Sequence, residues 1–84
     1  MGAPLKPVVL TSEQLAELNR KLSTLRHDVN NHLLLIMASS EMIQLRPETS
    51  PQMLKNLVDQ PPKISEAIKK FSAEFEQVLG IRRP

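Results

Sequence analysis

The hydrophobic residues in the first half of the chain recur at alternating steps of three and four, which places them on one face of an α-helix. They are Leu15, Leu18, Leu22, Leu25 and Val29, followed at steps of seven by Ile36 and Ile43. Thr11 can cap the start of this helix, because Gln14 three residues later can return the hydrogen bond. The pattern continues until Pro47 and predicts a helix over 12–46, about 50 Å long at 1.5 Å per residue.

Within each step of seven, the intermediate stripe position holds a residue that is not hydrophobic. These residues are His32, between Val29 and Ile36, and Ser39, between Ile36 and Ile43. The run 33–37 is entirely apolar and widens the hydrophobic face beside them. We therefore expect the second half of this helix to be more deeply enclosed than the first. His32 is expected to be a polar residue that packs within the stripe.

The second half of the chain repeats the spacing of three and four without interruption. Its stripe consists of Leu54, Leu57, Pro61, Ile64, Ile68, Phe71, Phe75 and Val78. Ser50 is the expected N-cap, with Pro51 at the first helical position, and Gly80 ends the helix. Pro61 and Pro62 each lack a backbone donor, so we expect a kink at 61–62. Because the stripe keeps its register through both prolines, the pattern predicts one bent helix over 51–79.

Two long amphipathic helices with a short connection predict an all-α fold, an antiparallel helical hairpin over 11–80. Residues 1–10 should form an extended N-terminal segment and 81–84 a short C-terminal tail. The apolar stripes are too wide for two helices to cover. We therefore expect a homodimer, in which two hairpins form a four-helix bundle.

The composition of the chain excludes several classes of binding site and function. The chain has 84 residues, enough for one small domain, and its two glycines cannot form a phosphate-binding loop. It has no cysteine, which excludes disulfides and thiolate-bound metal. A net charge of +2 with only 2% aromatic residues argues against nucleic-acid binding. No cofactor is expected. The two histidines, His27 and His32, lie about 140° apart around a helix, so they are poorly placed to share a metal ion.

The longest apolar run, 33–38, is far shorter than the roughly 20 residues of a membrane span. The N-terminal residues contain Pro4 and Pro7 and lack the continuous apolar stretch of a secretory signal. We therefore expect a cytoplasmic protein without a membrane partner.

Three polar residues on the first helix carry the candidate chemistry. His27 points away from the apolar stripe, and Asp28 and Asn31 lie beside it on the same accessible patch. A neutral imidazole is a competent nucleophile, and a neighbouring carboxylate can orient it. The Asn31 amide can bind a phosphoryl oxygen or position a water. Arg26 adds positive charge of the kind that phosphoryl transfer uses.

The sequence His-Asp-Val-Asn-Asn that begins at His27 resembles the H-box of the dimerisation and histidine-phosphotransfer domain of two-component sensor histidine kinases. It is closest to the variant with Asn four residues after His. The resemblance extends over the hairpin, although only this segment is specific. It implies that His27 accepts a phosphoryl group and exchanges it with the receiver domain of a response regulator. It further implies that Asp28 assists phosphorylation and that Asn31 aligns water for dephosphorylating the receiver.

The chain departs from this family in two ways. His32 stands where many members have proline, so a bend at that point of the first helix is absent or made differently. The ATP-binding domain is missing, so a complete chain of this kind could not phosphorylate itself from ATP. The chain is then either a fragment of a kinase or a stand-alone relay or phosphatase, with a receiver domain and a sensor kinase acting in trans as partners.

The alternative is a non-catalytic helical module for dimerisation or docking, in which His27 has no chemical role. An inactive adaptor that binds a kinase and blocks it belongs to this class. A basic helical nucleic-acid binder has the least support, because the cations do not cluster. The sequence leaves relay, phosphatase and adaptor as the alternatives, and it identifies neither the receiver nor the input signal.

Overall fold

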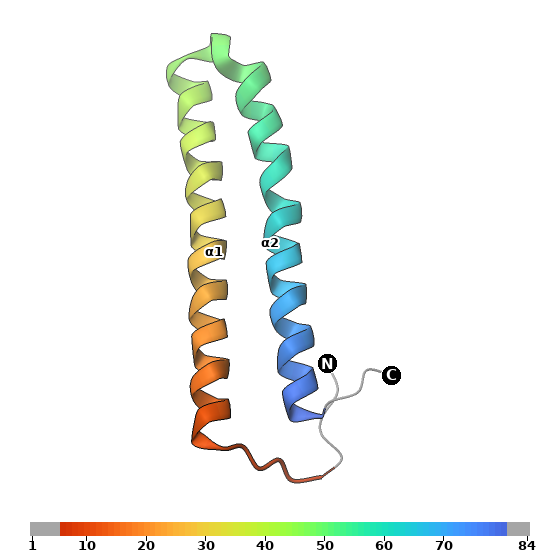
Figure 1. Ribbon diagram of the computed structural model, residues 1–84. Coiled ribbons are helices and arrows are strands. Elements are labelled where there is room, and N and C mark those ends of the chain that lie inside the picture. The colour runs from red at the N-terminus through yellow and green to blue at the C-terminus, as the bar shows by residue number, and fades with distance from the viewer. Residues whose placement is uncertain (1–5, 81–84) are drawn as a thin grey trace.

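The computed structural model describes residues 6–80 and is all-helical in this range, which confirms the all-α class. Helix α1 spans Ser12–Leu45, a 3₁₀ turn η1 spans Pro47–Thr49, and helix α2 spans Ser50–Leu79. The two long helices run antiparallel, side by side along their whole length (Figure 1). Residues 7–10 precede α1 without regular structure. The expected tail 81–84 and the first five residues of the expected extended segment lie outside the described residues.

Local hydrogen bonds explain where α1 begins. The Thr11 hydroxyl oxygen accepts from the Gln14 backbone N–H at 3.0 Å, and the Thr11 N–H donates to Gln14 Oε1 at 2.9 Å. This is the predicted capping box. It satisfies a backbone donor at each end of the first turn and therefore holds the helix start in place.

The start of α2 differs from the prediction. Ser50 is the first residue of the helix, with φ −52° and ψ −44°, and Thr49 is the N-cap residue. The prediction of Ser50 as N-cap was wrong, because η1 leads directly into α2 and Ser50 already has helical dihedrals. Its hydroxyl donates to the carbonyl oxygen of Pro47 at 2.6 Å instead of accepting from the next turn.

Gly80 ends α2 as predicted. It has φ +68°, the left-handed conformation that glycine adopts at little cost, and its N–H reaches the carbonyl oxygen of Gln77 at 3.3 Å. Between these ends, α2 passes through Pro61 and Pro62 as one continuous helix. The kink expected at 61–62 stays a prediction.

The residues of α1 and α2 that face each other form the seam. They are Leu18, Lys21, Leu25, Val29, His32, Ile36, Ser39 and Ile43 on α1, and Met53, Leu57, Gln60, Ile64, Ala67, Phe71, Glu74 and Val78 on α2. Each is buried or half-buried. The seam of α2 differs from the predicted stripe, since Leu54, Pro61 and Ile68 are exposed. The residues of α2 that face α1 recur at steps of four and three, starting from Met53. Leu54, Pro61 and Ile68 each follow one of these residues directly and therefore point to one side of the seam.

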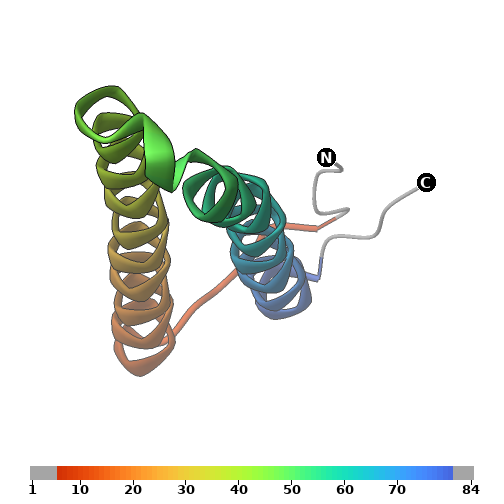
Figure 2. The same ribbon diagram turned by 90° about the horizontal axis from the view of Figure 1, so that it is seen from above.

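The helix pair covers little of its hydrophobic surface. Viewed along the helices (Figure 2), α1 and α2 form a single layer. No hydrophobic side chain among the described residues is fully buried. The expectation that the second half of α1 is more enclosed was wrong, since Leu33, Leu34, Leu35 and Met37 are all exposed. A single neighbouring helix can cover only one side of α1, whereas these residues point to several sides.

The overall dimensions agree with this exposure. The radius of gyration is 17.9 Å, against about 12 Å for a compact chain of this length. The accessible surface is 6717 Å², against roughly 5,000 Å² for a compact protein of the same mass. The helix pair therefore exposes more surface than a compact monomer of its size.

Candidate functional site

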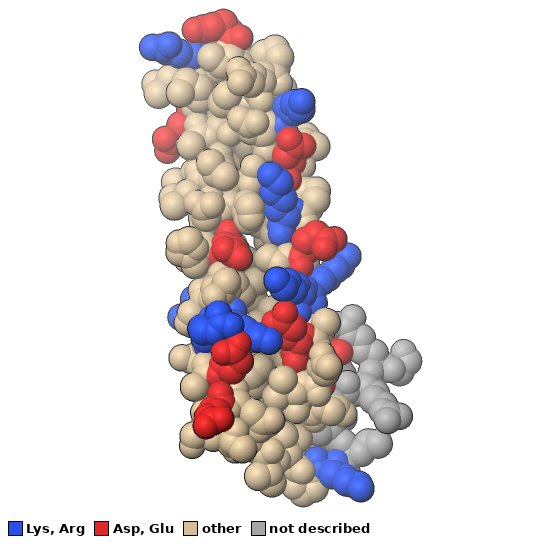
Figure 3. Space-filling view, in the orientation of Figure 1, with Lys and Arg blue, Asp and Glu red and all other residues tan. Residues whose placement is uncertain are grey.

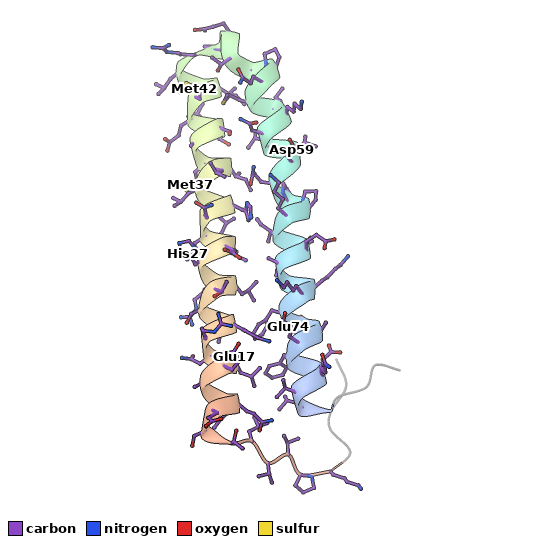
Figure 4. The ribbon with its side chains drawn as sticks, viewed as in Figure 1. Glu17, His27, Met37, Met42, Asp59 and Glu74 are labelled. Atoms are coloured by element: carbon purple, nitrogen blue, oxygen red, sulfur yellow. The ribbon has the colours of Figure 1, made fainter. Side chains whose placement is uncertain are left out.

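His27 lies on the lower half of α1, on the side away from α2 (Figure 4). Its side chain is 83% exposed, and its Nδ1 lies 3.7 Å from Asp28 Oδ1. The Asp28 side chain is 50% exposed, so its carboxylate is also open to solvent. At this separation the carboxylate can attract and orient a protonated or Nδ1–H imidazole without burying either group.

Asn31 is exposed on the same helix, four residues after His27 and three after Asp28. Side chains at these separations are neighbours on a helix, with Cβ atoms about 5–6 Å apart. His27 and Asp28 therefore lie beside each other on α1, and helical spacing puts Asn31 one turn further on the same exposed patch. A group held at this patch can meet a nucleophilic nitrogen, a carboxylate and an amide within one turn.

The patch borders a groove that runs between the helices. This charged groove is lined by Arg20, Lys21, Thr24, Leu25, Asp28, Ala67, Lys70, Phe71 and Glu74. Asp28 belongs both to the groove and to the patch. The groove brings Leu25 and Asp28 of α1 together with Ala67 and Phe71 of α2.

Charges on the groove side are mostly compensated. Figure 3 shows basic and acidic side chains side by side over the lower half of both helices. Lys21 Nζ lies 3.2 Å from Glu74 Oε2, an ion pair that links the two helices. Arg20 Nε donates to Glu17 Oε2 at 3.0 Å. This hydrogen bond lowers the pKa of Glu17 and raises the pKa of Arg20.

His32 has a different environment from His27. Its Nδ1 lies 2.7 Å from Gln60 Oε1, and Gln60 is only 7% exposed. His32 therefore packs as a polar residue within the seam, as predicted. The apolar pattern of α2 did not predict Gln60 as the partner of His32. Gln60 and Pro61 both lie between Leu57 and Ile64 at steps of three and four, so the apolar spacing did not distinguish them.

The described residues contain no group of three or more His, Asp or Glu side chains that could hold a metal ion. Within the same range, neither helix has a stretch sufficiently apolar to cross a bilayer. The comparisons with protein-family models, with curated proteins and with solved structures found no match to this chain.

Proposed function

We propose that this protein is a phosphotransfer element of a two-component signalling system, in which His27 exchanges a phosphoryl group with the receiver domain of a response regulator. The observation that carries the proposal is the exposed His27 imidazole with the Asp28 carboxylate 3.7 Å from its Nδ1, on the outward side of a long helix. The resemblance of 27–31 to the H-box gives this arrangement its chemical interpretation.

The transfer requires only the groups on the patch and those of the partner. In the receiver-to-histidine direction, a ring nitrogen of His27 attacks the phosphorus of the receiver's aspartyl phosphate. The new N–P bond forms as the P–O bond breaks, and the aspartate leaves as a carboxylate. The Asp28 carboxylate stabilises the positive charge on the ring. The reverse reaction returns the group to the receiver.

A dephosphorylating reaction would use Asn31 instead. Its amide would hold a water in line with the aspartyl phosphate of a docked receiver. That water attacks phosphorus, the P–O bond to the aspartate breaks, and inorganic phosphate leaves. This route does not require His27 as nucleophile. Relay and phosphatase activity therefore differ in which residue they need.

We further propose that the working unit is a homodimer forming a four-helix bundle. An apolar face consists of Leu15, Leu22 and Leu33 on α1 and of Leu54, Pro61 and Ile68 on α2. Helical geometry places both sets on the same side of the layer, opposite the charged groove, because antiparallel helices turn in opposite senses when viewed from one end. The surface in excess of a compact chain, about 1,700 Å², is ample for a standard interface of roughly 800 Å² per partner.

The test mixes the protein with phosphorylated receiver domains and follows the phosphate. A relay predicts an acid-labile label on His27 that is absent in His27→Ala. A phosphatase predicts faster release of inorganic phosphate, which Asn31→Ala abolishes. Asn19→Ala is the matched control, since Asn19 is an exposed asparagine on the same helix, eight residues before His27 and outside the patch. Absence of both signals across a panel of receivers would contradict the proposal.

The second candidate is a docking module without chemistry. It is favoured by Leu34 and Leu45, which are 61% and 79% exposed. Both project from α1 on the side away from the seam, where neither α2 nor a partner on the apolar face would cover them. This candidate predicts that His27→Ala retains every binding activity of the protein.

A further inference from the structure

The middle of α2 contains a weak turn. Pro61 and Pro62 lie inside the helix and have no N–H, so the carbonyl oxygens of Leu57 and Val58 lack the donors that a regular helix supplies four residues later. Consecutive prolines also press their rings against the preceding turn. The segment 57–62 is therefore the place where α2 bends most easily.

A polar contact with α1 lies at this same level. Gln60 directly precedes the two prolines, and its Oε1 lies 2.7 Å from His32 Nδ1. On either side the seam is apolar, with Val29 and Ile36 on α1. Gln60 is 7% exposed, so breaking this hydrogen bond leaves a buried amide without its partner. A bend that moves Gln60 away from His32 breaks this bond, so the bond opposes bending at the weak turn.

Bending at this turn would move one wall of the charged groove. The part of α2 that follows Pro62 carries Ala67, Lys70, Phe71 and Glu74, which line the groove opposite Asp28. His32 lies five residues after His27 on α1, about 7.5 Å along the helix axis. The width of the groove beside His27 therefore depends on the angle between the two halves of α2.

We propose that 57–62 is a hinge in α2 and that the His32–Gln60 hydrogen bond is the latch that holds it closed. Release of the latch opens the charged groove beside His27. The consequence for phosphotransfer rests on the proposed function, whereas hinge and latch are properties of the helix pair itself.

The first test measures distances between spin labels, which the cysteine-free sequence makes simple. The pair Ser23→Cys and Lys69→Cys reports on the half with the groove, and Glu41→Cys with Lys55→Cys reports on the half near η1. All four positions are exposed, and labelled chains are diluted with unlabelled ones to isolate distances within a chain. Gln60→Ala should broaden and lengthen the Ser23–Lys69 distribution and leave the other unchanged.

Gln77→Ala is the matched control, since Gln77 is an exposed glutamine on the same helix. It should change neither distance. An unaltered Ser23–Lys69 distribution in Gln60→Ala would overturn the proposal. Equal broadening of both pairs would also overturn it, because that indicates loosening of the entire helix pair without a hinge.

The second test does not depend on a Gln60 variant. Pro61→Ala combined with Pro62→Ala restores both backbone donors, so amide hydrogen exchange at 63–66 should slow by roughly tenfold or more. Unchanged exchange would show that 57–62 is no weak turn and would contradict the hinge. Neither test requires phosphate on His27. These tests can therefore confirm the hinge even if the phosphate experiments contradict the proposed function. They can equally contradict the hinge if phosphotransfer is confirmed.

Discussion

Lys21 on α1 and Glu74 on α2 form an ion pair across the helices, with Nζ and Oε2 3.2 Å apart. Their side chains are about one third exposed, at 30% and 31%, so water screens the pair only partly. The pair lies in the charged groove. Along α1 it is on the N-terminal side of His27, whereas the His32–Gln60 contact is on the C-terminal side. Together the two contacts define the register of α2 against α1.

The Lys21–Glu74 pair should contribute modestly to stability. A double-mutant cycle with Lys21→Gln and Glu74→Gln should give a coupling of about 0.5–1 kcal/mol, measured by urea unfolding at low salt. The coupling should shrink at high salt, because screening weakens a partly exposed pair. A coupling near zero at low salt would mean that the two side chains do not hold this geometry in solution.

The capping box at Thr11 should be measurable in the same way. Thr11→Ala removes the acceptor for the Gln14 N–H and should lower the free energy of unfolding by about 1 kcal/mol. Ser12→Ala serves as control, since Ser12 is the next residue, is exposed, and lies inside the helix. Equal losses in both variants would argue that the cap does not form.

The apolar face should decide the oligomeric state. Leu22→Lys and Ile68→Lys each place a charge on this face, and either should convert a dimer to a monomer in sedimentation equilibrium, because burying an unpaired charge is costly. Ser23→Lys adds the same charge at an exposed position on the outward side of α1 and should leave the dimer intact. A monomeric starting protein, or dimers that survive both changes, would refute the proposed bundle.

The ionisation of Glu17 should make a small part of the folding stability depend on pH, with more stability at higher pH. The hydrogen bond from Arg20 lowers the pKa of Glu17 below its ordinary value of 4.5. A depressed folded-state pKa contributes stability that is present above the unfolded pKa and is lost as the pH falls through the folded value. The effect is small, because the pair is exposed. Carboxyl NMR titration should show the pKa of Glu17 rising in Arg20→Gln, and an unchanged value would contradict this origin.

The elements of this protein could be read from local sequence patterns. Apolar spacing of three and four predicted two long helices over 12–46 and 51–79, and the structure has them at Ser12–Leu45 and Ser50–Leu79. Thr11 with Gln14 and the glycine at position 80 marked two ends correctly. These signals are local, since a cap or a helical stripe depends on residues within one or two turns.

The grouping of the patch residues could also be derived from the sequence. His27, Asp28 and Asn31 lie on one helix, so their spacing alone brings them together. The phosphotransfer role assigned to them stays a prediction, because it depends on a partner that recognises the patch.

Only the tertiary structure decided which residues meet across the helices. The seam of α2 uses Met53, Gln60 and Ala67 in place of Leu54, Pro61 and Ile68, and no pattern within α2 distinguishes these neighbouring stripes. The choice depends on how α2 rotates against α1, where His32 finds Gln60 and Lys21 finds Glu74. Periodicity determines that a helix has an apolar side, whereas packing determines which edge of that side faces the other helix and which edge is left exposed.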